Sequence, residues 1–193
     1  CALGLATPTA VTVGIGRGAE LGILIKRGEA LEVPGRLTGV IFDKTGTLTV
    51  GRPSVTDLLP VGVQGETLLS LAASVERNSQ HPLAQAIVKE AGRRGLPFQE
   101  SASFDTLGGK GVAARVLGEE ILVGNRTLLK DRGIPLGEEV EGKVAGLEGE
   151  GKTVILVSAG GQLAGLIGVA DTLKATAAEA VRRLRARDLE VIM

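Results

Sequence analysis

The segment Asp43-Lys44-Thr45-Gly46-Thr47 places a carboxylate, two hydroxyls and a glycine directly after the apolar run Val40–Phe42. The apolar run predicts a strand, and ligands of open α/β sheets bind beyond the carboxyl ends of the strands. An aspartate at that point can attack a phosphoryl group if a metal ion and nearby hydroxyl or N–H groups neutralise the phosphate oxygens. We therefore expect Asp43 to be a nucleophile, with Thr45 and Thr47 beside the phosphate.

The residue two positions after Asp43 indicates how long a phosphorylated state would last. Soluble phosphatases of the haloacid dehalogenase type usually carry a second aspartate there, which acts as general acid and base and lets water clear the phosphoenzyme. Thr45 has no titratable proton near neutral pH. A phosphorylated Asp43 should therefore persist, which suits a pump better than a hydrolase.

Asp43–Thr49 reads DKTGTLT and resembles the phosphorylation motif of the P-type ATPases at every position. The resemblance implies that Asp43 is phosphorylated and that Lys44, Thr45 and Thr47 are further catalytic residues. It also implies that Mg²⁺ is held partly by Asp43 and by the backbone carbonyl of Thr45. The alternative is an aspartate that merely caps a turn after a buried strand.

The composition excludes several classes of function. The chain of 193 residues has 22 basic and 22 acidic side chains, so nothing in its charge suggests a nucleic-acid partner. One cysteine rules out an internal disulfide framework. Tyr and Trp are absent, so an adenine site here cannot rely on stacking against those rings.

Residues 1–16 are apolar and uncharged, but they fall short of the roughly 20 residues of a spanning helix. They predict either a short buried helix or the tail of a longer hydrophobic segment. Residues 1–10 resemble the sequence that follows the intramembrane Cys-Pro-Cys of heavy-metal-transporting P-type ATPases, with Cys1 matching the second cysteine. The resemblance implies that Cys1 binds the transported metal, for which thiolates favour Cu⁺ or zinc-type ions. Arg17–Glu32 then reads as a helical cytosolic extension.

An inserted module is predicted after Thr49, with Gly51-Arg52-Pro53 as a hinge. Its residue pattern predicts helices and short strands, of which the last two strands form a hairpin around Ala159-Gly160-Gly161. The expected helices are 66–77, 82–94, 125–132 and 137–147, and the expected strands are 54–63, 97–104, 112–117, 120–123, 153–158 and 162–169. We expect an α+β module on an antiparallel sheet.

Glu76 and the single histidine, His81, lie at the end of one predicted helix and the start of the next. Both can face one pocket, where Glu76 could accept a hydrogen bond from an adenine amino group and a neutral His81 ring could lie along the base. Ser79–Leu83 resembles the Ser-Glu-His-Pro-Leu motif in the nucleotide-binding domain of the same pumps. Gln80 departs from it, since the family usually has Glu there. Alone, a histidine at a helix start is more often a cap.

Two glycine-containing stretches belong to the same expected site. Gly109 and Gly111 match the family's Gly-x-Gly, which implies a close approach of the backbone to the nucleotide. Gly124-Asn125 resembles the end of the family's Val-Gly-Asn. The resemblance thus implies an ATP site formed by Glu76, His81, Gly109, Gly111, Gly124 and Asn125.

Two further motif matches are rejected. Gly146–Thr153 satisfies the Walker A pattern, but a P-loop requires a strand before it and a helix after it, and here the predicted order is reversed. Asn125-Arg126-Thr127 fits a glycosylation sequon, but it lies in a module that we expect to be cytosolic.

The chain is expected to return to the first domain near Asp171. Asp171–Lys174 resembles the family's hinge motif, and a strand that ends on Asp171, a helix over 175–187 and a strand over 189–193 predict a βαβ unit. The family's Thr-Gly-Asp and Gly-Asp-Gly motifs do not occur up to Met193. We therefore expect a fragment that binds ATP with little or no turnover.

The sequence thus predicts an α/β fold: an incomplete haloacid dehalogenase-like, Rossmann-type phosphorylation domain with an inserted α+β nucleotide-binding domain. The expected division is 1–32 for the end of a membrane helix and its extension, 33–52 and 169–193 for the phosphorylation domain, and 53–168 for the insert. The resemblance implies part of an ATP-driven heavy-metal export pump, Cu⁺ most of all, in a multi-pass membrane protein with these domains on the cytoplasmic side. A soluble phosphatase or phosphotransferase and a non-catalytic nucleotide-binding module are the alternatives.

Overall fold

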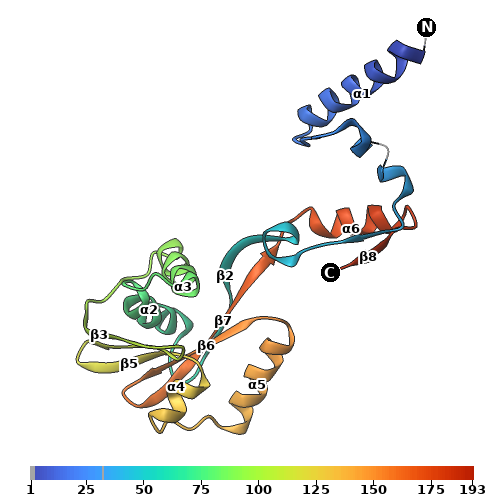
Figure 1. The fold of residues 1–193 in the computed structure, drawn as a ribbon. Helices are drawn as coiled ribbons and strands as arrows, with labels where there is room; N and C mark the ends of the chain where they lie inside the picture. Colours follow the sequence, from blue (N-terminus) through green and yellow to red (C-terminus); the bar gives the residue numbers. More distant parts are fainter. Residues whose placement is uncertain (1–2, 32) are drawn as a thin grey trace. The chain divides into compact units, whose positions relative to one another are not determined.

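The computed structural model describes residues 3–31 and 33–193. The chain divides into two compact units, which are Cys1–Lys44 with Ala175–Met193, and Thr45–Lys174 (Figure 1). The polypeptide thus passes from one unit to the other after Lys44 and returns after Lys174.

The unit Thr45–Lys174 is built on one antiparallel sheet of six strands, as the sequence predicts. The strand order is β2-β7-β6-β5-β4-β3. The strands are β2 (Thr49–Pro60), β3 (Ser101–Leu107), β4 (Gly111–Val116), β5 (Glu119–Gly124), β6 (Thr153–Ala159) and β7 (Gln162–Leu173). Ala159 pairs with Gln162 across Gly160 and Gly161, both of which have positive φ, so β6 and β7 form the predicted tight hairpin.

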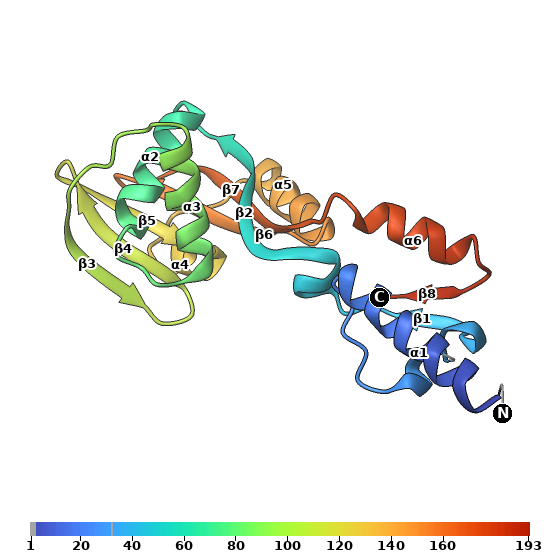
Figure 2. The same cartoon turned by 90° about the horizontal axis from the view of Figure 1, so that it is seen from above.

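Helices cover both faces of this sheet (Figure 2). The helices are α2 (Gly65–Glu76), α3 (Pro82–Arg93), α4 (Arg126–Asp131) and α5 (Glu138–Gly149). Ile155 and Val157 of β6 join the core beneath α2 and α3, whereas Val154 and Leu156 join the core beneath α4 and α5. Burial of both faces explains why β6 is continuously apolar rather than alternating.

Two expectations for this unit are wrong. Gly51-Arg52-Pro53 is no hinge between elements but part of β2, where the pairing with β7 is irregular between Thr49 and Pro53. Gly51 has φ +75 and Pro53 lacks an N–H, so both interrupt the ladder without ending the strand. Likewise, no separate strand ends on Asp171, because β7 runs unbroken to Leu173.

The other unit contains α1 (Leu3–Glu20), η1 (Gly28–Leu31), η2 (Val33–Arg36), β1 (Gly39–Ile41), α6 (Ala177–Arg185) and β8 (Glu190–Ile192). β1 pairs in parallel with β8, with Val40 opposite Val191. The expected βαβ unit is therefore wrong in its first strand, because β7 belongs to the antiparallel sheet and the parallel partner of β8 is β1.

The helix α1 ends at Glu20, so only Arg17–Glu20 of the expected helical extension over Arg17–Glu32 belong to it. The Ile23 N–H donates to the Gly18 carbonyl at 2.8 Å and the Gly22 N–H donates to the Ala19 carbonyl, with Gly22 at φ +78. This is a glycine-terminated helix end. None of residues 4–20 is buried, so a buried core helix is also wrong. Within the described ranges, no helix is both long and apolar enough to cross a membrane.

Candidate functional site

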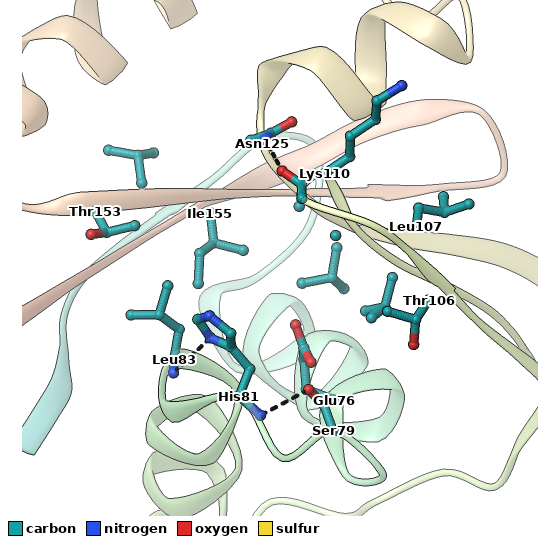
Figure 3. A pocket seen from close by; sticks show the side chains of 16 residues that line it. Glu76, Ser79, His81, Leu83, Thr106, Leu107, Lys110, Asn125, Thr153 and Ile155 are labelled. Atoms are coloured by element: carbon teal, nitrogen blue, oxygen red, sulfur yellow. Dashed lines mark hydrogen bonds between the residues drawn. The ribbon is translucent and has the colours of Figure 1, made fainter.

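A pocket of about 350 Å³ opens in the unit Thr45–Lys174, between the α2–α3 connection and the strands β4, β5 and β6 (Figure 3). Six predicted residues from four places in the sequence line it together: Glu76, His81, Gly109, Gly111, Gly124 and Asn125. Gln80 is exposed and does not line the pocket, so the departure from the family motif leaves its wall unchanged.

Glu76 is the last residue of α2 and is only 8% exposed. Its Oε2 atom is buried and has no hydrogen-bond partner among the residues that the structure describes. Burial raises the pKa of the Glu76 carboxyl to about 7, and the polar side chain of nearby Ser79 opposes part of that rise. A ligand that donates a hydrogen bond would satisfy this oxygen.

His81 is the N-cap of α3, and its Nδ1 atom accepts a hydrogen bond from the Leu83 N–H at 3.2 Å. Pro82, which lacks an N–H, follows at the first helical position. A ring whose Nδ1 accepts carries its proton on Nε2 when neutral. His81 therefore caps the helix and keeps an N–H that a ligand in the pocket can use.

Asn125 shapes the turn between β3 and β4. Its side-chain amide donates to the Gly109 carbonyl at 3.0 Å, and its Oδ1 atom accepts from the Leu128 N–H at 3.1 Å, which caps α4. Its own N–H donates to the Lys110 carbonyl at 2.8 Å. Both polar ends of the Asn125 amide are thus engaged in hydrogen bonds.

Gly111 and Gly124 face each other where β4 pairs with β5. A Cβ atom on Gly111 would lie 2.2 Å from the Val123 carbonyl oxygen, and one on Gly124 would lie 2.2 Å from the Lys110 carbonyl oxygen. The close approach of β4 and β5 is therefore sufficient to require glycine at both positions, whether or not a ligand binds there. A Cβ atom on Gly109, in contrast, would meet nothing within 4 Å.

Sequence reasoning missed several residues of the pocket wall: Ser79, Leu83, Thr106, Leu107, Lys110, Thr153 and Ile155. Most are apolar or small and carry no pattern of their own. Lys110 lies between two predicted site glycines, and that position was a usable signal. Its amino group points away from Glu76 and His81 and pairs with Asp131 at 2.7 Å (Figure 3).

The residues of the phosphorylation-type motif lie where the sequence places them, just after the strand β1. The Phe42 N–H donates to the Ile192 carbonyl at 2.8 Å, which extends the β1–β8 pairing up to Asp43. Asp43 and Lys44 belong to one unit, and Thr45 and Thr47 to the other. The described residues contain no group of three or more acidic, histidine or cysteine side chains placed to hold a metal ion. Cys1 lies outside the described residues.

Asp171 forms hydrogen bonds with the first residues of β2 within the unit Thr45–Lys174. Its carboxylate accepts hydrogen bonds from the Thr49 hydroxyl and from the N–H groups of Gly51 and Arg52, the last at 3.1 Å. The Thr49 hydroxyl oxygen in turn accepts from the Gly46 N–H at 3.1 Å. The Lys174 amino group donates to the Gly46 carbonyl at 2.8 Å. Both the N–H and the carbonyl of Gly46, in the turn after Asp43, are thus hydrogen-bonded to side chains.

The Walker-like stretch has the reversed order that the sequence predicts, since the helix α5 precedes it and the strand β6 follows it. The Lys152 amino group forms ion pairs with Asp57 at 2.8 Å and with Glu150 at 2.7 Å. Lys152 therefore joins the end of α5 to β2 and is no phosphate-binding lysine of a P-loop.

Comparison with known proteins agrees with this fold. Residues 37–193 match the haloacid dehalogenase-like hydrolases, so the chain belongs to that family. It is 50% identical over 193 residues to a probable copper-exporting P-type ATPase of Archaeoglobus fulgidus, which covers all of the chain and 24% of the relative.

Solved structures give the same result. A zinc-transporting PIB-type ATPase in its E2.Pi state superposes with a TM-score of 0.89 at 43% identity, covering 99% of the chain and 31% of that protein. The catalytic domain of the CPx-ATPase CopB-B, studied for changes upon nucleotide binding, gives 0.65 at 26% identity, covering 92% and 61%. The chain spans about a quarter of the length of the curated relatives it matches.

Proposed function

We propose that this chain is the ATP-binding and phosphorylation-motif portion of an ATP-driven pump that exports a heavy-metal cation, with Cu⁺ the cation that we favour. The observation that carries the proposal is the buried, unpartnered Oε2 atom of Glu76 in a pocket that the predicted residues line together. The copper-exporting and zinc-transporting names of the relatives support the same class of protein.

In this proposal the pocket binds the adenosine part of ATP. The Glu76 carboxylate accepts a hydrogen bond from the adenine amino group, and the His81 ring lies along the base. Gly109, Gly111, Gly124 and Asn125 form the wall opposite these two side chains. The pocket can hold a purine without an aromatic ring, because apolar side chains such as Leu83 and Ile155 supply much of the contact surface.

Asp43 is the proposed phosphoryl acceptor. Its carboxylate attacks the γ-phosphorus of ATP, ADP leaves, and an aspartyl-phosphate remains on Asp43. Lys44 and Thr47 contact the transferred group. Mg²⁺, when bound, neutralises phosphate charge; Asp43 and the Thr45 carbonyl supply oxygen ligands of the kind it prefers. Because Thr45 cannot act as general base, the aspartyl-phosphate survives long enough to drive a conformational change.

The remaining assignments concern the whole pump. We propose that residues 33–52 and 169–193 belong to its phosphorylation domain, that 53–168 form its nucleotide-binding domain, and that Asp171 marks the hinge between them. Residues 1–32 would then end a membrane helix, with Cys1 as a ligand of the transported metal. The pump would be a multi-pass membrane protein with these domains on the cytoplasmic side.

A calorimetric ATP titration tests the proposal. Glu76→Ala is expected to weaken ATP binding roughly ten- to a hundredfold, because loss of a buried hydrogen-bond acceptor costs about 1 to 3 kcal/mol. Glu66→Ala is the matched control, since Glu66 is exposed in the first turn of the same helix. It should leave the dissociation constant unchanged.

The same titration separates the alternatives. Absence of ATP binding by the folded wild-type chain would contradict the proposal and favour a soluble phosphatase of the same family. Binding that survives Glu76→Ala unchanged would show that the adenine lies elsewhere.

Lys152→Ala tests the rejection of the Walker-like stretch. We expect ATP affinity to stay within about twofold of wild type, while the free energy of unfolding falls by about 1 kcal/mol because Asp57 loses its partner. The Lys152 hydrogen bond is the main cause of the lowered pKa of Asp57, so Asp57→Asn should destabilise the chain similarly. Calorimetry and urea unfolding measure the two quantities. Loss of ATP binding on Lys152→Ala would restore the P-loop hypothesis.

A further inference from the structure

Arg126 is the first residue of α4 and does not line the candidate nucleotide pocket. Its guanidinium donates two hydrogen bonds to the Glu148 carboxylate, at 2.8 and 2.9 Å, and its Nε atom donates to Glu141 at 3.0 Å. Both carboxylates belong to α5. A bidentate pair between arginine and a carboxylate fixes orientation as well as distance. Arg126 therefore joins the first turn of α4 to α5.

The helix dipoles favour neither charge of the pair that Arg126 forms with Glu148. A cation is disfavoured at a helix N-terminus and an anion at a helix C-terminus. Arg126 is the first residue of α4, and Glu148 lies in the last turn of α5, which ends at Gly149. Each charge offsets the other only because the pair forms. The contacts of Arg126 with α5, and not the preference of its own helix, therefore explain an arginine at this position.

Asn125, the residue before Arg126, connects the same helix start to the pocket wall. Its Oδ1 atom accepts from the Leu128 N–H at 3.1 Å, and its side-chain amide donates to the Gly109 carbonyl at 3.0 Å. Its backbone N–H donates to the Lys110 carbonyl at 2.8 Å. A Cβ atom on Gly109 would meet nothing within 4 Å, so close packing does not hold this part of the turn. Its position therefore depends on Asn125.

We propose that Arg126 is a positioning residue of the nucleotide site: it holds the start of α4 on α5 so that Asn125 keeps the turn at Gly109 where ATP requires it. Figure 3 shows Asn125 across the pocket from Glu76 and His81. A displaced turn would therefore change the distance between opposite walls. The inference rests on the proposed binding of ATP. It extends the site across the sheet, since α4 and α5 cover the face opposite to α2 and α3.

ATP titrations of the whole chain test this inference. Arg126→Ala is expected to weaken ATP binding about two- to fivefold, a modest factor because these ion pairs are partly exposed. Glu148→Gln removes the bidentate partner and should weaken binding similarly, although Glu148 does not line the pocket. Arg126→Lys keeps the charge but loses the planar fork, so it should restore binding only in part.

Arg132→Ala is the matched control. Arg132 directly follows α4 and pairs with Glu120 of β5 at 2.6 Å, and its side chain is 35% exposed against 39% for Arg126. This variant should leave the dissociation constant of ATP unchanged even if it loses some stability. Thermal unfolding of each variant checks that it is folded. Should Arg126→Ala unfold, Glu148→Gln takes its place with the same expected loss of affinity.

A double-mutant cycle tests whether the effect passes through Asn125. Asn125→Ser can still cap α4, but it lacks the amide that donates to the Gly109 carbonyl. We expect this variant to weaken ATP binding at least as much as Arg126→Ala does. On the Asn125→Ser background, Arg126→Ala should change the dissociation constant less than about 1.5-fold, because the route is already broken.

The amide NMR resonance of Gly109 in the ligand-free chain is a readout that does not depend on ATP. It should shift in Arg126→Ala and in Glu148→Gln, because the turn moves, and it should stay in place in Arg132→Ala. A general loss of stability would not produce this pattern.

The outcomes separate the inference from the function on which it rests. Wild-type ATP affinity together with an unshifted Gly109 resonance in a folded Arg126→Ala variant would overturn the positioning role. Full additivity of Arg126→Ala and Asn125→Ser would overturn the route through Asn125. If wild type binds no ATP, the proposed function fails, and the Gly109 resonance alone decides whether Arg126 positions the turn.

Discussion

Alanine at Gly111 is expected to lower the free energy of unfolding of the antiparallel unit by about 3 kcal/mol or more, measured by urea unfolding. The added Cβ atom would lie 2.2 Å from the Val123 carbonyl oxygen and 2.5 Å from Gly124 Cα. Both are backbone atoms of the paired strand β5, so no side chain can move aside. Gly111 also has φ +142, a conformation that side chains disfavour. The strands β4 and β5 must separate locally to accept the change.

Gly109→Ala is the matched control, because Gly109 lies two residues earlier in the same turn and has open space around it. Its φ of +69 makes alanine cost about 1 to 2 kcal/mol, which is less than at Gly111. If the backbone at Gly109 approaches the nucleotide, Gly109→Ala should lower the free energy of ATP binding by more than it lowers the free energy of unfolding.

Comparison of the two variants decides why the Gly-x-Gly pattern is glycine at both positions. A large loss of stability confined to Gly111→Ala would assign Gly111 to strand pairing and leave Gly109 as the candidate for backbone approach to ATP. Equal and small losses of stability in both variants would contradict the packing argument for Gly111.

The resemblance to the family's Gly-x-Gly and Val-Gly-Asn predicted these glycines as site residues, but it could not predict that Gly111 and Gly124 oppose each other. That relation depends on the register of β4 against β5, which pairs residues thirteen positions apart. The elements themselves were predicted well where a strong local signal existed, such as the Gly160-Gly161 turn and the amphipathic helices. Some errors fall where tertiary pairing overrides the local signal, as at Gly51-Arg52-Pro53, whereas the end of α1 at Gly22 is a local signal that the helix prediction over Arg17–Glu32 missed.

The candidate site was predictable in the residues that carry unusual chemistry, and not in those that position them. Glu76 and His81 were found because a carboxylate and the single histidine flank a helix connection. Ser79 opens the motif match over Ser79–Leu83 but was not predicted as a site residue, because its place in the pocket wall depends on the orientation of α2 and α3. Likewise, the contacts of Asp171 with Thr49 join residues 122 positions apart, which no local pattern reveals.

Replacing Glu76 by glutamine is expected to stabilise the ligand-free chain at pH 8 and to have little effect at pH 4. Burial raises the pKa of the folded-state carboxyl from 4.5 to about 7. Below the unfolded-state pKa the group is neutral in both states. As the pH rises from 4.5 to 7, the unfolded chain releases the proton before the folded chain does, so folding loses free energy. Above pH 7 the whole penalty is present.

The rise of the Glu76 pKa from 4.5 to about 7 sets the size of this effect at about 3 to 4 kcal/mol, since one pKa unit corresponds to about 1.4 kcal/mol. Urea unfolding of wild type and Glu76→Gln across pH 4 to 8 measures it. Glu90→Gln is the control of opposite sign, because Arg93 and Arg94 lower the pKa of Glu90 to about 2. That variant should lose some stability at neutral pH and gain none above pH 7.

A difference between wild type and Glu76→Gln that does not grow with pH would contradict the burial of an ionisable Glu76. If the difference grows as expected, the ligand-free chain carries a cost at this one side chain that a less polar residue would avoid. Binding of a 6-amino purine would supply the missing donor to Oε2 and recover part of that cost. The carboxylate that destabilises the ligand-free chain is therefore also the group that we expect to bind the adenine amino group. Glu76→Gln should raise the free energy of unfolding at pH 8 and weaken ATP binding.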